Sequence, residues 1–167
     1  MNASTARKIP QGPLMRPLQV GAVAVEFAFV IVILLLIMAG MVEFGRTFWY
    51  ADALTKATRD GARAMSSWPI ESISSQGLDV ARAMTQNSAN AANVSPLLVP
   101  GNVQVQCLNE AFNAVACTNG TPPANVKVSI TGFTVTLGEW FPFIGQDSLI
   151  SLGSIALAPH TTMRYMN

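Results

Sequence analysis

A long run of apolar residues restricts what this chain can fold into more than any other feature of its sequence. Residues 27–42 read FAFVIVILLLIMAGMV, sixteen residues without a charge, and Ala22–Val25 extend the run behind a lone Glu26. The 21 residues from Ala22 to Val42 rise by about 1.5 Å each, which is enough to cross a hydrocarbon core of about 30 Å. A buried helix of a soluble protein seldom lacks a polar face over this length. The sequence therefore predicts a transmembrane helix at residues 22–45.

The charges around the run predict how this helix is oriented. The first 21 residues hold three basic residues and no acidic one, so the other seven basic residues and all nine acidic residues follow Gly21. The positive-inside rule then places the N-terminus in the cytoplasm and the C-terminal domain outside the inner membrane. Trp49 and Tyr50 are predicted to mark the outer interface as an aromatic belt. Because the chain has no clustered basic surface, it is not expected to bind nucleic acid.

Glu26 is a carboxylate inside the apolar segment. On insertion scales such a group costs about 2.5 to 3.5 kcal/mol at mid-helix and less near the interface. One interpretation is that Glu26 pairs with a cation when helices of several subunits pack together. The other is that it is a tolerated interfacial carboxylate, which snorkels to the headgroups or is protonated.

A secretory signal peptide is the nearest alternative, since a basic segment followed by an apolar one is its general plan. The apolar run is too long for such a peptide, and it is followed by EFGR rather than by a small-residue cleavage pattern. An anchored helix is therefore favoured over a removed one.

Three stretches of the sequence resemble the type IV pilin superfamily. Within it they are most similar to the TadE-like proteins, minor pilins or pseudopilins of the tight adherence (Tad) pilus. The stretches are GAVAVEFAFV at residues 21–30, MVEFGRTFWYADALTKATRDGARAM at 41–65, and SIALAPHTTMRY at 154–165. The resemblance covers residues 21–65 well and the C-terminal strands loosely.

The resemblance implies a processing site and an assembly contact. A prepilin peptidase would cut after Gly21 on the cytoplasmic side, so that Ala22 becomes the first residue of the mature chain and Glu26 the fifth. Ala22, Glu26 and Phe27 would contact other major and minor pilins. In that assembly, Glu26 would neutralise the Ala22 ammonium of a neighbouring subunit.

The function implied is a minor pilin or pseudopilin that takes part in assembling a Tad pilus for surface attachment, by priming, capping or forming its tip. Its partners would be the inner membrane, the other pilins, the prepilin peptidase and the pilus assembly platform. The alternative is an unprocessed single-span envelope protein that scaffolds a secretion or pilus machine.

Beyond the apolar run the sequence predicts that the helix continues. Small and apolar residues recur every three or four positions over residues 46–68, which is typical of an amphipathic helix that ends before Pro69. The charged side of this extension is predicted to be solvated. A stripe of small residues allows another helix or a sheet to approach closely, and packing on the protein's own sheet is favoured. The stripe consists of Ala53, Ala57, Gly61 and Ala64.

The rest of the chain predicts a small domain at residues 69–167. A second, weaker helix is predicted from Leu78 and an exposed loop at residues 87–96. After Gly101 apolar residues alternate with polar ones in segments rich in Val, Ile and Thr, which predicts an antiparallel sheet. Gly132 is predicted to bend one long strand. The fold class predicted is α+β, with a long N-terminal helix, transmembrane in its lower half and amphipathic in its upper half, packed on a small antiparallel β-sheet.

Cys107 and Cys117 are the only cysteines, and both follow the apolar run. In an oxidising compartment such an isolated pair is expected to form a disulfide. A metal site would need more ligands at closer spacing, and a redox motif would usually be C-x-x-C. Metal, cofactor and enzymatic activity are therefore not expected, and His160 is predicted to be a surface or strand residue.

Two local questions stay open from the sequence. Glu43 and Arg46 are three residues apart and can pair within one helix or between subunits. The aromatic cluster WFPF at residues 140–143 is either a small core under a loop or a contact for another pilin.

Overall fold

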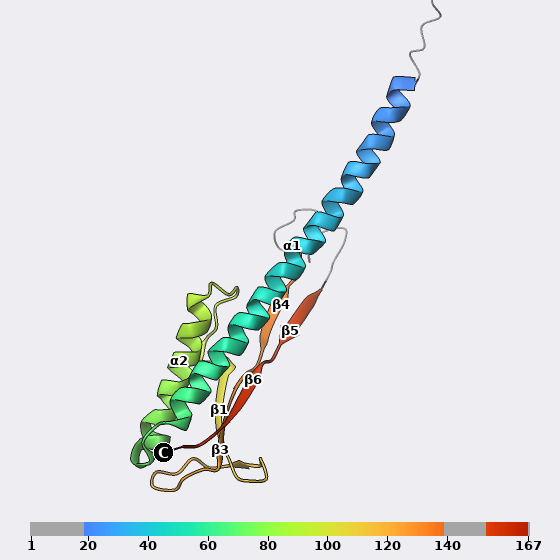
Figure 1. Ribbon diagram of the computed structural model, residues 1–167. Coiled ribbons are helices and arrows are strands. Elements are labelled where there is room, and N and C mark those ends of the chain that lie inside the picture. Colours follow the sequence, from blue (N-terminus) through green and yellow to red (C-terminus); the bar gives the residue numbers. More distant parts are fainter. Residues whose placement is uncertain (1–18, 139–152, 167) are drawn as a thin grey trace, which may run out of the picture. The chain divides into compact units, whose positions relative to one another are not determined.

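The computed structural model describes residues 19–138 and 153–166 of the chain. The chain divides into two compact units, Met1–Ala39 and Gly40–Asn167. Helix α1, Gln19–Ser66, begins in the first unit and ends in the second (Figure 1). The predicted amphipathic extension is therefore a continuation of the apolar helix, and the WFPF cluster lies outside the described residues.

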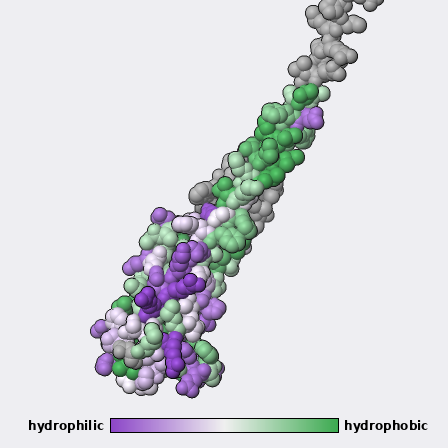
Figure 2. Space-filling model, in the orientation of Figure 1, coloured by the Kyte–Doolittle hydropathy of each residue, from purple (hydrophilic) through white to green (hydrophobic). Residues whose placement is uncertain are grey.

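In the first unit α1 has apolar side chains on every side. All residues from Gly21 to Met38 are exposed, and the face of this part of the helix that Figure 2 shows is mostly hydrophobic. Only 6% of its most apolar stretch is buried within the chain, whereas the core helix of a soluble protein would be mostly covered. Within the described ranges, α1 is the one helix long and apolar enough to span a membrane.

The second unit combines the C-terminal part of α1 with a second helix and two small sheets (Figure 1). This is the predicted α+β fold. Its helical elements after α1 are η1 (Ile70–Ser72), η2 (Ile73–Gly77), α2 (Leu78–Ala91) and η3 (Pro100–Asn102). Its strands are β1 (Val103–Leu108), β2 (Ala114–Val115), β3 (Asn125–Ile130), β4 (Phe133–Thr136), β5 (Ser154–Leu157) and β6 (His160–Arg164).

The main sheet has four antiparallel strands in the order β2-β1-β3-β6. In β1 the side chains of Val103, Val105 and Cys107 are buried, and those of Gln104 and Gln106 are exposed. Successive side chains of a strand point to opposite faces, so this alternation assigns one face to the core. The same core contains apolar side chains from both helices.

Gly132 interrupts a long strand, as its sequence context predicts. It adopts φ of 71°, a left-handed conformation that glycine tolerates without a steric penalty. Before it β3 pairs with β6, and after it β4 pairs with β5 in a separate two-stranded sheet. Ile130 N donates to Pro159 O at 3.0 Å across the bend, so the four strands form one hairpin with a kink.

At Gly61 helix α1 lies directly against helix α2. A Cβ at this position would collide with Thr85 Oγ1 and lie 3.0 Å from Ala81 O. The prediction that the small-residue stripe packs on the sheet is therefore wrong at Gly61, where the partner is a helix of the same chain. The absence of a side chain lets the two backbones approach.

Helix α2 is longer than predicted. It continues to Ala91, beyond the predicted start of an exposed loop at residue 87. The Asn- and Ser-rich composition favours a loop, but the burial of Ala89 in the core outweighs this weak propensity. The segment after the helix is also partly buried, through Val94 and Leu98.

The C-terminal end of α1 is completed by residues from the far end of the described chain. Met166 N donates to Ser66 O at 2.9 Å, and the Tyr165 hydroxyl donates to Trp68 O at 2.7 Å. The first bond satisfies a carbonyl group that the helix end leaves without an intrahelical partner, and the second satisfies a carbonyl of the turn that follows. Burial, and then the nearby Glu71 carboxylate, raises the pKa of Tyr165 above its ordinary value of 10.0, which further favours the protonated hydroxyl that donates this bond.

Cys107 and Cys117 form the predicted disulfide, with their Cα atoms 5.3 Å apart. Cys107 is fully buried in β1, and Cys117 is half-buried at the edge of the core. Two residues later, Asn119 Oδ1 accepts a hydrogen bond from Ser74 N at 2.8 Å. The disulfide therefore fixes the segment that contacts the turn following α1.

We expect Gly61→Ala to lower the free energy of unfolding of the second unit by about 1 to 3 kcal/mol, the usual cost of overpacking. The measurement is chemical denaturation of the full chain in detergent micelles, followed by near-ultraviolet circular dichroism. Gly45→Ala is the matched control, because a Cβ there meets nothing within 4 Å. A Gly61→Ala variant as stable as the Gly45→Ala variant would show that the helices do not need this contact.

We expect Cys117→Ser to lower the same free energy by about 3 kcal/mol, because it releases a short closed loop in the unfolded chain. Cys107→Ser should lower it further, since it also places a hydroxyl at a fully buried position. Reduction of the parent protein should reproduce the Cys117→Ser value. Serine variants that unfold at the denaturant concentration of the oxidised parent would contradict this role of the disulfide.

Candidate functional site

Gly21 and Ala22 lie in the first turn of α1, which begins at Gln19. The first four N–H groups of a helix have no intrahelical acceptor, so this turn is held less firmly than the turns after it. Both residues are exposed, and a Cβ on Gly21 would meet nothing within 4 Å. No packing within the described chain requires a glycine here, so the reason for it lies elsewhere.

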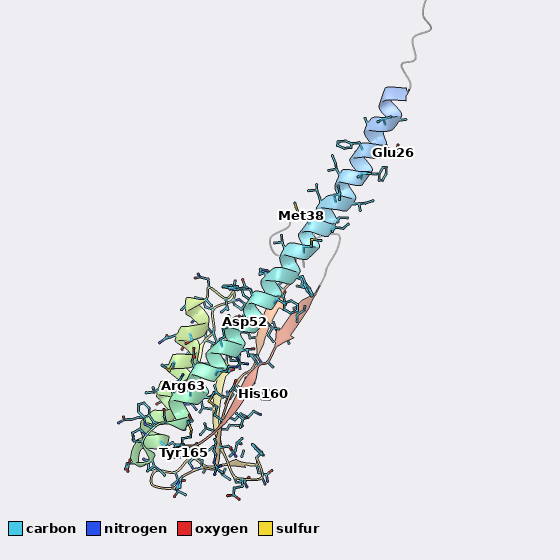
Figure 3. All side chains as sticks on the ribbon, viewed as in Figure 1. Glu26, Met38, Asp52, Arg63, His160 and Tyr165 are labelled. Atoms are coloured by element: carbon cyan, nitrogen blue, oxygen red, sulfur yellow. A yellow bond between two sulfur atoms is a disulfide. The ribbon has the colours of Figure 1, made fainter. Side chains whose placement is uncertain are left out.

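Glu26 lies one turn after Ala22, near the N-terminal end of α1 (Figure 3). Residues four apart share a helix face and are separated by about 6 Å along its axis. Glu26 is exposed among apolar neighbours, and Phe27 beside it is 63% exposed. Among the residues that the structure describes, none forms an ion pair or hydrogen bond with the Glu26 side chain. A partner for this carboxylate would have to come from outside the described part of the chain.

Glu43 and Arg46 form an ion pair within one helix, which answers one of the questions left open by the sequence. Arg46 Nη2 lies 2.7 Å from Glu43 Oε2, and both side chains are less than 10% exposed. The same nitrogen donates to Thr136 O of β4 at 2.6 Å, and the guanidinium lies 5.8 Å from the centre of the Tyr50 ring. This buried pair attaches α1 to the second sheet just after the apolar run ends.

The aromatic belt differs from the prediction. Trp49 is 60% exposed, but Tyr50 is buried in the core beneath Arg46. Consecutive residues of a helix point about 100° apart, so the two cannot share one face. Phe44 and Phe48 are exposed instead, with their ring centroids 4.7 Å apart. Their spacing of four residues was the sequence signal for this pair.

The charged side of the extension is solvated, as predicted. Lys56 and Asp52 form an exposed ion pair of 2.6 Å, a contact that contributes little to stability at the surface. Arg63 and His160 lie elsewhere on the surface of the second unit (Figure 3). Within residues 19–138 and 153–166, no three His, Cys, Asp or Glu side chains are grouped so that they could hold a metal ion.

Together these residues make α1 a helix that can lie in lipid or pack among other helices. Its first turns present one carboxylate on an otherwise apolar surface, and its later turns are fixed in a folded domain by a buried ion pair. Within the described residues, this arrangement suits a helix that anchors the chain in a membrane and associates with other helices.

Comparison with known proteins agrees with this description of α1. Residues 21–63 match the family of TadE-like proteins, which confirms over this segment the resemblance seen in the sequence. The match lies within helix α1 and does not extend to the rest of the second unit. No curated protein and no solved structure matches the chain.

Proposed function

We propose that this chain, with its TadE-like N-terminal segment, is a minor pilin or pseudopilin that takes part in assembling a Tad pilus by priming, capping or forming its tip. The role is structural rather than enzymatic. Its partners would be the other pilins, the prepilin peptidase and the pilus assembly platform, all of which would contact α1.

The observation that carries this proposal is the state of α1 in the first unit. An apolar helix of membrane-spanning length is exposed on all sides, and its single carboxylate finds no partner in the described chain. A lipid-exposed carboxylate is costly, so Glu26 requires a partner that another subunit can supply. The Ala22 ammonium of a neighbouring mature subunit is the cation that the resemblance to pilins offers.

The proposed topology has the N-terminus in the cytoplasm and the second unit in the periplasm. The basic leader supports this orientation by the positive-inside rule. The disulfide supports it independently, because such bonds persist in oxidising compartments such as the bacterial periplasm.

Processing after Gly21 requires the first turn of α1 to open. A peptidase needs an extended backbone at the cut, whereas the Gly21–Ala22 bond lies inside the helix. Glycine is less favourable than alanine in a helix by about 1 kcal/mol, so it eases this opening. We therefore assign Gly21 two roles, which are fitting the peptidase and weakening the helix where it must unwind.

The direct test of the proposed function is intact-mass measurement and N-terminal sequencing of protein extracted from its own membrane. Loss of the 21 residues that end at Gly21, together with co-purification of other pilins, is the expected result. An intact leader would instead identify an unprocessed envelope protein that scaffolds the machine.

We expect Gly21→Leu to leave full-length protein in the membrane, since a bulky residue at the cut blocks the peptidase. Immunoblotting of membrane fractions separates the two lengths. Gly40→Leu is the matched control, because it makes the same change in the same helix at a position where a Cβ also meets nothing within 4 Å. Normal processing of Gly21→Leu would contradict the proposed cleavage by a prepilin peptidase after Gly21.

We expect Glu26→Gln to insert and to be processed like the parent, but to co-purify with other pilins at a yield at least about tenfold lower. The substitution would leave the Ala22 ammonium of a neighbouring subunit without its partner. A charge buried unpaired in a helix bundle costs several kcal/mol, and about 1.4 kcal/mol of binding free energy corresponds to a factor of ten in affinity. The variant keeps the size of the side chain and removes its charge.

Two controls accompany Glu26→Gln. Glu26→Asp keeps the charge and should recover part of the yield, whereas Glu110→Gln changes an exposed carboxylate of the second unit and should behave like the parent. If Glu26→Gln co-purifies with pilins as well as Glu110→Gln does, Glu26 is a tolerated interfacial carboxylate and makes no assembly contact.

A further inference from the structure

Five exposed apolar side chains lie on two neighbouring segments of the second unit, and we call them the apolar rim. Three belong to α1 and two to the loop between α2 and β1. Their exposed fractions lie between 54% and 66%, so the described chain leaves more than half of each one uncovered. The apolar rim consists of Phe44, Phe48, Trp49, Leu97 and Val99.

The two segments of the rim are joined by a hydrogen bond. Trp49 Nε1 on α1 donates to Ala92 O, just after the end of α2, at 3.1 Å. Figure 1 shows the end of α2 and the loop that follows it beside α1, at the end of the second unit where α1 enters. The loop therefore begins at the level of Trp49.

The loop presents its apolar residues in a fixed conformation. Leu98 is buried, and its backbone N–H and C=O are both bonded to the Asn90 side chain, at 2.8 and 3.0 Å. Val94, which precedes Leu97 by three residues, is also buried. Leu97 and Val99 flank Leu98 and point away from the core. Burying these two side chains would cost no further ordering of the loop.

The position of the rim along α1 matches the outer boundary of a bilayer. Trp49 follows Val42, the last residue of the apolar run, by seven positions, or about 10 Å along a helix axis. The headgroup layer extends about 5 to 8 Å beyond the hydrocarbon core on each side. Helical side chains also lean toward the N-terminus, so the Trp49 ring reaches back into that layer.

The distribution of charged residues along the sequence is also consistent with contact at the headgroup boundary. No charged residue stands between Arg82 and Glu110, the segment that contains the end of α2 and the whole loop. A surface in contact with the headgroup boundary gains from apolar area and loses from charges that must be desolvated. Lacking basic residues, this surface has no means of attracting anionic lipids in particular.

We propose that the apolar rim contacts the outer surface of the bilayer that α1 spans. The second unit would then be held at the membrane by Leu97 and Val99 as well as anchored by α1. The ligand is the boundary between lipid headgroups and acyl chains, with no preference for anionic lipid. This inference requires the membrane span but not a role in pilus assembly, so it survives if the pilin proposal fails.

The test uses the full chain in phosphatidylcholine nanodiscs with an environment-sensitive fluorophore on Leu97→Cys. Labelling is selective, because the two native cysteines are joined in a disulfide. Phe112→Cys is the matched control, since Phe112 and Leu97 are both 65% exposed, and Phe112 follows the end of β1 that is farther from the loop. Val99→Cys repeats the measurement at a second position.

We expect the probes at positions 97 and 99 to emit at shorter wavelength than the probe at 112, and to be quenched by lipids with a spin label near the headgroup. Replacing part of the phosphatidylcholine with phosphatidylglycerol should leave the quenching unchanged. Equal emission and quenching at all three positions would overturn the proposal. A blue shift without lipid quenching, lost when each disc holds one chain, would also overturn it, by showing that a second copy covers the rim.

Discussion

The rest of the structure depends on α1 remaining one helix while its surroundings change from lipid to protein. In hydrocarbon every backbone N–H and C=O must be bonded within the segment, which only a helix or a closed barrel achieves. The helix cannot end where the apolar run ends, because its next turns supply the core of the second unit. Its side chains change instead, from apolar on every side to apolar on one side.

Where the surroundings change, the helix is held by a polar contact rather than by apolar packing alone. Glu43 and Arg46 are buried within four residues of Val42, and Arg46 also bonds to β4. A buried pair of this kind is weak evidence for stability, because desolvation offsets much of the attraction. Its geometry nevertheless fixes the rotation of α1 about its axis, since only one face brings Arg46 to Thr136. That rotation decides which aromatic residues stay exposed and which, like Tyr50, enter the core.

Sequence periodicity predicted the parts of the fold that repeat. The apolar run, the three-to-four-residue spacing on the extension and the alternation in β1 each identify an element and its buried face. The disulfide followed from the count and location of the cysteines. The match to TadE-like proteins covers the same segment in which the sequence pattern was clearest.

Contacts between segments far apart in the sequence were not predictable. The sequence identifies Gly61 only as one of a stripe of small residues, and the folded chain shows that its neighbour is Thr85 of α2. The hydrogen-bond partner of Tyr165 could not be predicted from the sequence, because the acceptor is a backbone carbonyl that any residue at position 68 would provide. The end of α2 was placed too early because burial of Ala89 depends on tertiary packing, which local composition does not record.

The hydrogen bonds at the end of α1 also set an order of events. Tyr165 and Trp68 are 97 residues apart, and bringing such distant segments together carries a loop-closure entropy cost before the contact can stabilise the fold. Until residues 160–166 reach Trp68, the later turns of α1 lack β6 and the bonds that follow it. The second unit therefore cannot complete its fold until nearly the whole chain has been synthesised, and until then the apolar stripe of α1 stays uncovered.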